Sequence, residues 1–205
     1  MVGDNIAFIV LQILLLGDKY MQYWSKSILS IHRYLETLSK AIDGLVKKNS
    51  KVSNSMGNNS TYMLASKIIE WTDKKKKMIN LKVATIDALK KVNKESRRIL
   101  ILFYIDGVKG STIADLLGCS IRTYYRKKKL ALDRFAIALK SVGYDEEYLT
   151  KHYGNEKWLM SVYDKCLERD TITQDTAILE EDKSIMKGII KDLKYIKCYL
   201  FSTYV

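Results

Sequence analysis

The chain has 205 residues, of which 47% are hydrophobic, so it can bury a sizeable core and is not broadly disordered. It contains no proline and only 10 glycines, which favours long helices and argues against a barrel or sandwich with many tight turns. The net charge is +12, and residues 90–140 hold 13 basic and four acidic side chains, so three quarters of the charge lies in a quarter of the chain. Such a localised basic region indicates a polyanionic partner.

Cysteine and histidine usage argues against metal and disulfide chemistry. Cys119, Cys166 and Cys198 are far apart, no CxxC motif occurs, and the two histidines, His32 and His152, are isolated. We therefore expect reduced thiols, no metal site, no cofactor and a cytoplasmic location. The sequence also has no phosphate-cradling glycine loop or nucleophile motif, so we do not expect an enzyme.

The amino-terminal region, residues 1–46, is predicted to be helical. The apolar run 6–17 is shorter than the roughly 20 residues needed to cross a bilayer, and no basic leader of a signal peptide precedes it. We favour a buried or oligomer-forming helix here over a membrane role. Apolar residues then recur every three or four positions, as on one side of a helix: Ile28, Ile31, Leu35, Leu38, Ile42 and Leu45.

Residues 47–61 are polar and rich in Asn and Ser, which predicts a mobile linker. A second domain is expected over 62–142, beginning with a long helix at 62–91. The basic run 74–77 is interpreted as a solvated face of this helix, with a phosphate contact as the alternative. The apolar face of the helix is expected to include Leu64, Ile68, Trp71, Lys75, Met78, Ile79, Val83, Ile86 and Leu89.

Residues 95–105 are short and strongly apolar, and their pattern alone fits a buried strand or a buried helix. A turn is expected in the DGVKG sequence that follows. Residues 143–205 are expected to form a helical extension, with an amphipathic segment at 155–170. Its last helix either packs against the rest of the chain or forms a homodimer contact, because apolar residues recur there at coiled-coil spacing: Met186, Ile189, Leu193, Ile196 and Leu200.

Two helices joined by a tight turn are predicted from the segment STIADLLGCSIRTYYRKKKLALDRFA. Ile113, Leu116 and Leu117 give the first helix an apolar side. Gly118 follows where a residue in the left-handed conformation commonly ends a helix, and Ser120 can cap the next one. This is the layout of a helix-turn-helix motif.

The second of these helices must face two ways. Tyr124, Ala131, Leu132 and Phe135 have the spacing of a core-facing stripe. Lys128 interrupts that stripe, so we expect its stem to lie along apolar surface with its ammonium group in solvent. The other side of the helix could be an ordinary basic surface. The glycine turn, the serine cap, the core spacing and the local positive charge occur together, however, and this combination favours DNA binding.

Candidate DNA-contacting residues lie around the amino end of this second helix. A recognition helix presents that end to base edges in the major groove, where arginine reads guanine and apolar groups contact the thymine methyl. We expect base contacts from Ile121, Arg122, Tyr125 and Arg126. Phosphate contacts, which position the protein without reading sequence, are expected from Lys109, Ser120, Thr123, Lys127, Lys129 and Arg134.

The segment RRILILFYIDGVKGSTIADLLGCSIRTYYRKKKLALDRF resembles the promoter-reading region 4 of bacterial sigma factors. Its RTYYRKKKLALDRFA portion is similar to phage transcriptional regulators of the ArpU/RinA type. The resemblance implies an all-α protein with a sigma region-4-like helix-turn-helix domain, so residues 95–105 become a helix. It also implies that Ile121, Arg122, Tyr125 and Arg126 stand at base-contacting positions, whereas residues 1–30 and 145–205 lie outside it.

These features lead to the expectation of a sequence-specific transcription regulator of phage or mobile-element type that binds double-stranded promoter DNA. A divergent sigma factor acting through RNA polymerase is the first alternative. A DNA-packaging adaptor similar to a terminase small subunit is the second.

Overall fold

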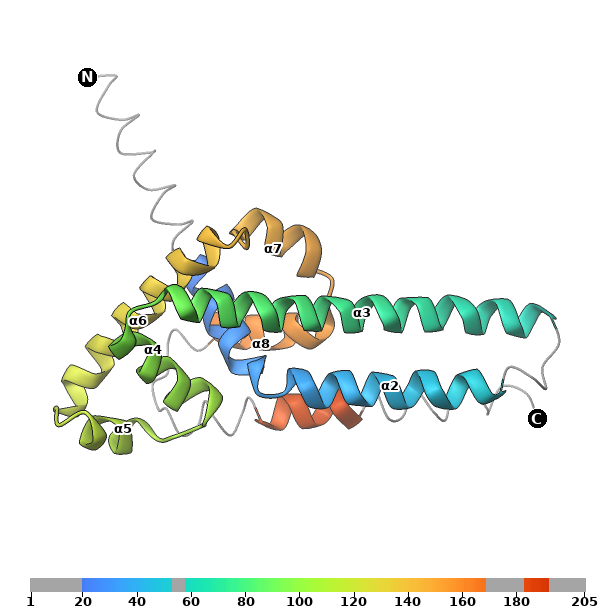
Figure 1. The fold of residues 1–205 in the computed structure, drawn as a ribbon. Helices are drawn as coiled ribbons and strands as arrows, with labels where there is room; N and C mark the ends of the chain where they lie inside the picture. Colours follow the sequence, from blue (N-terminus) through green and yellow to red (C-terminus); the bar gives the residue numbers. More distant parts are fainter. Residues whose placement is uncertain (1–19, 53–57, 169–182, 192–205) are drawn as a thin grey trace, which may run out of the picture.

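A computed structural model describes residues 20–52, 58–168 and 183–191 of the chain, and no strand occurs in these ranges. The predicted all-α class is confirmed. A helix at 20–32 comes first and a helix at 183–191 comes last. Between them lie α2 (Leu35–Val52), α3 (Asn58–Lys91), α4 (Lys94–Leu100), the π-helical turn η2 (Ile101–Ile105), α5 (Gly110–Leu116), α6 (Ile121–Ser141), α7 (Glu146–Tyr153) and α8 (Lys157–Glu168) (Figure 1).

α2 and α3 form a long antiparallel hairpin, and its half nearest the connection between them projects beyond the other helices (Figure 1). Midway along the hairpin, an ion pair of 2.6 Å between Lys75 Nζ and Asp43 Oδ1 joins the two helices. The structure therefore differs from the expected linker at 47–61, because α2 continues to Val52 and α3 begins at Asn58. The Asn49 amide bonds the carbonyl of Leu45 one turn back, at 2.8 Å, so this polar residue is accommodated within a helix.

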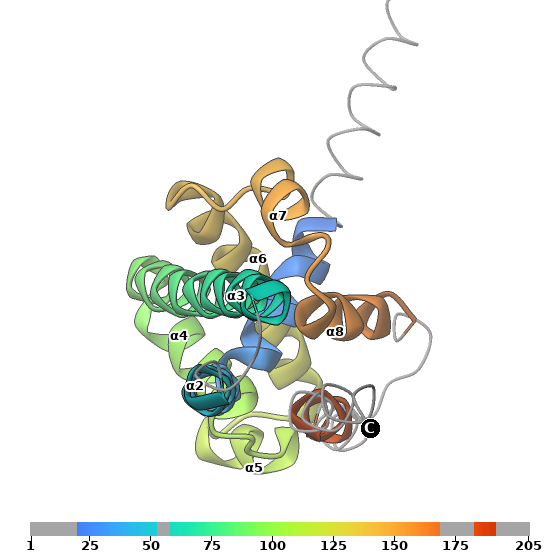
Figure 2. The ribbon, with the colours of Figure 1, turned by 90° about the vertical axis from the view of Figure 1, so that its right-hand side faces the viewer.

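One hydrophobic core connects the expected amino-terminal region, the second domain and the carboxy-terminal extension. Helix 20–32 lies among α3, α6 and α8 (Figure 2) and buries the Trp24 ring, whose centroid is 4.5 Å from that of Tyr163 on α8. Met186 of the last helix is also fully buried, so the described part of that helix packs against its own chain. Six residues predicted as a buried stripe are all in this core: Ile28, Ile31, Leu35, Leu38, Ile42 and Leu45.

The core-facing side of α3 is only partly the side that its sequence predicts. Trp71 and Met78 are buried as expected, but the side chains of Ile79, Val83 and Ile86 are 46%, 52% and 38% exposed. α3 meets its neighbours instead through a set that contains small residues, which allow close approach of helix backbones: Leu81, Ala84, Thr85 and Ala88. α3 thus carries a second apolar stripe that contacts nothing in the core.

The apolar segment 95–105 is helical, as its resemblance implies, but it changes character halfway. After Leu100 the helix widens, so that the Asp106 N–H bonds the carbonyl of Ile101, five residues back, at 2.9 Å. Gly107 then turns the chain with a φ of +72°, a conformation that favours glycine. Phe103 and Tyr104 are buried in this widened turn.

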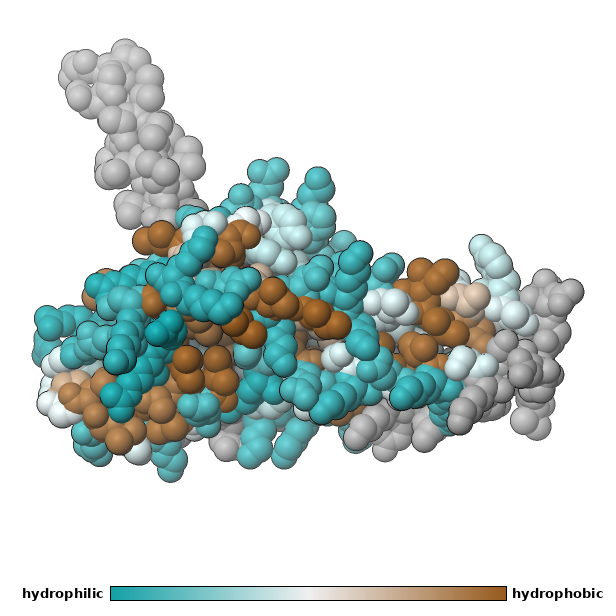
Figure 3. Space-filling model, viewed as in Figure 1, coloured by the Kyte–Doolittle hydropathy of each residue, from teal (hydrophilic) through white to brown (hydrophobic). Residues whose placement is uncertain are grey.

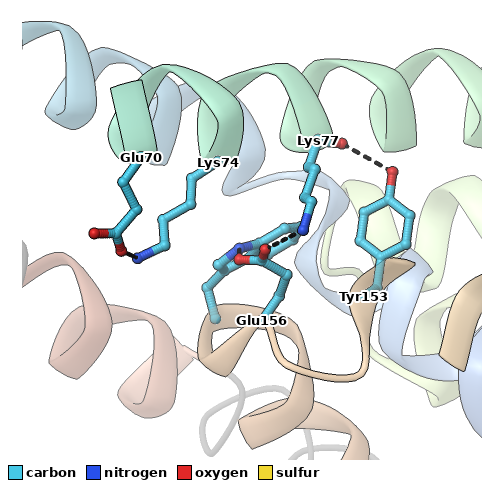
Figure 4. A network of polar contacts seen from close by, with 6 residues as sticks. Glu70, Lys74, Lys77, Tyr153 and Glu156 are labelled. Atoms are coloured by element: carbon cyan, nitrogen blue, oxygen red, sulfur yellow. Dashed lines mark hydrogen bonds and ion pairs between the residues drawn. The ribbon is translucent and has the colours of Figure 1, made fainter. Parts of the chain in front are cut away.

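Three of the four lysines at 74–77 are engaged within the protein. Lys74 pairs with Glu70 on the same helix, and Lys75 pairs with Asp43. Lys77 reaches the loop between α7 and α8, where its Nζ lies 2.6 Å from Glu156 Oε1 (Figure 4). Two of the four lysines, Lys75 and Lys77, therefore attach α3 to neighbouring segments.

Glu156 is the most buried member of this group, with a side chain that is 8% exposed. Its second oxygen accepts a hydrogen bond of 2.8 Å from Trp158 Nε1. The adjacent Tyr153 hydroxyl donates to the Lys77 carbonyl at 3.2 Å, and burial raises the pKa of that hydroxyl (Figure 4). A buried carboxylate thus has both oxygens satisfied, and it holds α7 and α8 against α3.

Replacing Lys77 with Met should lower the free energy of unfolding by about 1–3 kcal/mol, because Glu156 would keep a buried charge with one partner fewer. Lys74→Met is the matched control on the same helix, and its exposed pair with Glu70 should contribute about 0.5 kcal/mol or less. Urea unfolding of both variants measures the difference. Equal losses would contradict the role given to Glu156.

His32 occupies the end of helix 20–32, where both of its ring nitrogens are buried and neither has a hydrogen-bond partner among the described residues. Burial lowers the pKa of its imidazole, and the nearby Lys82 ammonium lowers it further. The folded protein therefore holds this ring neutral more strongly than the unfolded chain does, where its pKa is about 6.5.

Folding stability should consequently fall as the pH drops from 8 to 5.5, because the unfolded chain takes up the proton first and the folded one resists it. The contribution of the neutral His32 ring to the free energy of unfolding is complete above pH about 6.5 and is lost as the pH falls below that value. His32→Leu should reduce the loss of stability between pH 8 and 5.5, whereas His152→Leu, at an exposed position, should leave that loss unchanged. Thermal unfolding at the two pH values provides the measurement.

Candidate nucleic-acid interface

The turn between α5 and α6 is closed by backbone hydrogen bonds around Gly118. The Cys119 N–H bonds the Ala114 carbonyl at 3.0 Å, and the Gly118 N–H bonds that of Asp115 at 3.1 Å. This paired arrangement is a Schellman motif, which requires a left-handed residue, and Gly118 has a φ of +60°. The predicted end of the first helix is therefore confirmed at this glycine.

α6 begins at the predicted cap. The Ser120 side chain accepts a hydrogen bond of 3.2 Å from the Thr123 backbone N–H, and its oxygen lies 2.9 Å from the Thr123 hydroxyl. The cap satisfies one of the free amides of the first turn, so the helix starts at a defined residue. Lys109, immediately before α5, is exposed in an extended conformation.

The inner face of α6 is the one that its sequence predicts. Tyr124, Ala131 and Phe135 are fully buried, and Leu132 is 5% exposed. These side chains fix the rotation of α6 about its own axis. On α5, Ile113 is fully buried, but Leu116 is 53% exposed, so the expected apolar side of that helix is narrower. α5 has only seven residues, and its buried residues are confined to Gly110, Ile113 and Ala114.

Lys128 does not extend its ammonium group into solvent as predicted. The residue is 9% exposed, and its Nζ lies 3.5 Å from the centroid of the Phe103 ring. The rings of Tyr104 and Tyr125 are both 5.8 Å away. The faces of these aromatic rings are negative, so they stabilise a cation that has lost part of its hydration. The sequence could not reveal this contact, because the first two rings come from a distant segment.

Three basic side chains line the outer face of α6. Arg122, Arg126 and Lys129 follow one another at intervals of four and three residues, and all three are exposed. Among the residues that the structure describes, none of the three makes a hydrogen bond or an ion pair. Beside them, Ile121 and Tyr125 are 45% and 44% exposed, respectively. We call these five residues the outer face of α6.

The opposite edge of α6 is attached to α4. Lys127 Nζ lies 2.7 Å from Glu95 Oε1, and this pair lowers the pKa of the Glu95 carboxyl and raises that of the Lys127 ammonium. Arg134 donates hydrogen bonds to Asn93 Oδ1 at 3.1 Å and to Ser96 Oγ at 2.9 Å. These two residues, expected at phosphates, therefore have partners within the chain.

An acidic side chain marks the far end of the outer face. Asp133 lies one turn beyond Lys129, and its Oδ1 accepts a hydrogen bond of 2.5 Å from the Gln22 side chain. Helix 20–32 thus contacts α6 directly, a contact that sequence reasoning missed. The signal was present only as an acid within a basic helix, which does not identify its partner.

The structure brings the ten expected contact residues to one end of the protein but divides them by environment. Five form the outer face, two are engaged with α4, and Lys109, Ser120 and Thr123 lie before or at the start of α6. No group of three or more His, Cys, Asp or Glu side chains suited to a metal ion occurs in the part of the chain that the structure describes. Within that part, no helix has the length and apolar character needed to cross a membrane.

Comparison with known protein families matches part of the chain. Residues 61–136, from α3 to the middle of α6, match a family described as a protein of unknown function, DUF1492. The match includes α4, α5 and the outer face of α6. No curated protein and no solved structure is similar to the chain.

Gly118→Ala should lower the free energy of unfolding by about 1–2 kcal/mol, because alanine resists the left-handed conformation even though no atom would collide with its side chain. Gly118→Asn should cost less. Gly44→Ala provides a control of opposite sign, since Gly44 lies inside α2 and alanine favours a helix by roughly 0.5–1 kcal/mol. Chemical denaturation of the three variants tests this order, and a harmless Gly118→Ala would contradict the backbone assignment.

Proposed function

We propose that this chain is a sequence-specific regulator of transcription that binds double-stranded DNA, with α5 and α6 acting as a helix-turn-helix. In this proposal α6 enters the major groove and its outer face meets the bases. The observation that carries the proposal is an anchored inner face combined with three cationic side chains on the outer face that have no partner among the described residues. The sequence resemblance to phage regulators of the ArpU/RinA type supports the same conclusion.

The chemistry of the outer face suits base recognition. Arg122 and Arg126 can each donate two parallel hydrogen bonds to the O6 and N7 atoms of guanine. Ile121 and the ring of Tyr125 expose apolar surface next to them, as contact with a thymine methyl group requires. Lys129 lies farther along the helix, where an ammonium group can follow the phosphate backbone.

Residues at the edges of α6 would position the helix on the duplex. The ion pair between Lys127 and Glu95 is solvent-exposed, so a phosphate can replace the carboxylate. Arg134 is more firmly held by Asn93 and Ser96 and serves mainly to orient α4 against α6. Lys109 and the amino end of α6 present further donors to the backbone.

The proposal can be tested on a duplex selected by the protein from random sequences, with a scrambled duplex for comparison. Arg126→Ala should weaken binding to the selected duplex by roughly 1–3 kcal/mol and reduce discrimination between the two. Lys129→Ala should weaken both and lower the slope of log affinity against log salt by about one. Fluorescence anisotropy at several salt concentrations measures both quantities.

Lys40→Ala is the matched control, because Lys40 is an exposed cation on α2 that pairs with Glu36 away from α6. It should leave affinity, discrimination and salt slope unchanged. Failure to select any sequence, or an Arg126→Ala protein with the parent's discrimination, would overturn the proposal.

A further inference from the structure

α3 has an exposed seam on the side opposite the core. Its apolar part appears as two brown areas along the helix in Figure 3. Tyr62 and Ile69 are 79% and 62% exposed, and Ile79, Val83 and Ile86 continue the same line. The outer seam consists of Tyr62, Ala65, Ile69, Thr72, Lys76, Ile79, Val83, Ile86 and Lys90, all exposed.

The spacing of the outer seam is that of a coiled coil. Its members alternate at intervals of three and four residues over about four heptads, and six of the nine are apolar: Tyr62, Ala65, Ile69, Ile79, Val83 and Ile86. The core-facing residues of α3, such as Met78 and Thr85, fall between these positions on the opposite side. α3 therefore has two apolar faces. The described fold buries one of these faces and leaves the other exposed.

The outer seam is complementary to itself when two copies run antiparallel. If Ile69 of one copy faces Ile79 of the other, the same register places Ala65 against Val83 and Tyr62 against Ile86. Each apolar layer then occurs twice, as a two-fold axis requires. The apolar residues near one end of the seam match those near the other end, and the polar residues remain together at its centre.

The charges at the centre agree with this arrangement. The same register brings Lys76 of one copy level with Thr72 of the other, next to the exposed carboxylate of Asp73. The two lysines and the two aspartates can therefore pair across the axis. A polar layer of this kind favours one register over shifted ones, because a shift would bury the lysine against apolar residues.

We propose that a second copy of this chain docks on the outer seam, so that two α3 helices form an antiparallel pair. The seam is roughly 40 Å long at 1.5 Å per residue, which is long enough for a stable two-helix contact. The proposal goes beyond the DNA-binding function and does not depend on it, because the seam and the outer face of α6 share no residue.

The test measures the mass of the full-length protein by light scattering after size exclusion. The parent should elute at twice the chain mass of 23.7 kDa. Ile69→Glu and Ile79→Lys should each shift the protein to the mass of one chain, since each places an unpaired charge in the seam. Ile137→Lys is the matched control, because Ile137 is 68% exposed on α6 and lies outside the seam.

The double variant carrying Ile69→Glu and Ile79→Lys decides the orientation. In the antiparallel register each glutamate faces a lysine of the other copy, so the double mass should return. In a parallel pair like charges would meet, and the protein would remain single. Circular dichroism should show unchanged helix content in all variants, because the altered positions are exposed.

Three results would overturn the proposal. A parent protein with the mass of one chain would exclude self-association. A double mass that persists in both single variants would move the contact to another surface, such as the last helix. A double variant that stays at the mass of one chain, while both single variants do too, would exclude the antiparallel register.

Discussion

The burial of one face of α6 is the constraint on which the rest of the structure depends. Tyr124, Phe135 and Leu139 are fully removed from solvent, and each contributes roughly 1.5–3 kcal/mol through its burial. They contact neighbours on several other helices, so α6 cannot rotate without opening the core. Because side chains on a helix have fixed angular positions, this face also sets the direction of Arg122 and Arg126.

Polar contacts along the edges of α6 refine that position. Lys128 places its charge on the Phe103 ring, Arg134 holds the start of α4, and Asp133 accepts a hydrogen bond from Gln22. Each contact joins α6 to a segment far away in sequence. The cations of this helix therefore fall into two groups: some hold the fold, and Arg122, Arg126 and Lys129 are exposed on its outer face.

Local features of the structure could be predicted from the sequence, because the residues that determine them are neighbours. The Schellman turn at Gly118 and the cap at Ser120 involve interactions across only a few residues. The inner face of α6 follows from spacing alone. The environment of Lys128 could not be predicted, because it depends on Phe103, which reaches it only through the packing of η2 on α6.

The face of α3 shows a different limit of sequence patterns. The helix has two apolar stripes, and the single apolar face expected from periodicity combined residues of both, such as the buried Met78 and the exposed Ile79. The choice depends on Ala84 and Ala88, whose small side chains let other helices come close, although larger residues such as Ile79 and Val83 are more hydrophobic. The Asn- and Ser-rich composition of 47–61 likewise suggested a linker, whereas α2 extends to Val52 and α3 already begins at Asn58.

Helix 20–32 lies at the centre of the fold, and because the chain is synthesised from its amino end, this helix is made before most of the helices that pack against it. This helix and the α2–α3 hairpin leave the ribosome before α6, so an apolar platform is ready when Tyr124 and Phe135 emerge. One side of this apolar surface remains uncovered until α8, with its core residues Trp158 and Tyr163, has been synthesised. A fragment cut at the borders of the matched segment, 61–136, would lack both the first and the last of these contributions, and its newly exposed core would favour aggregation over folding.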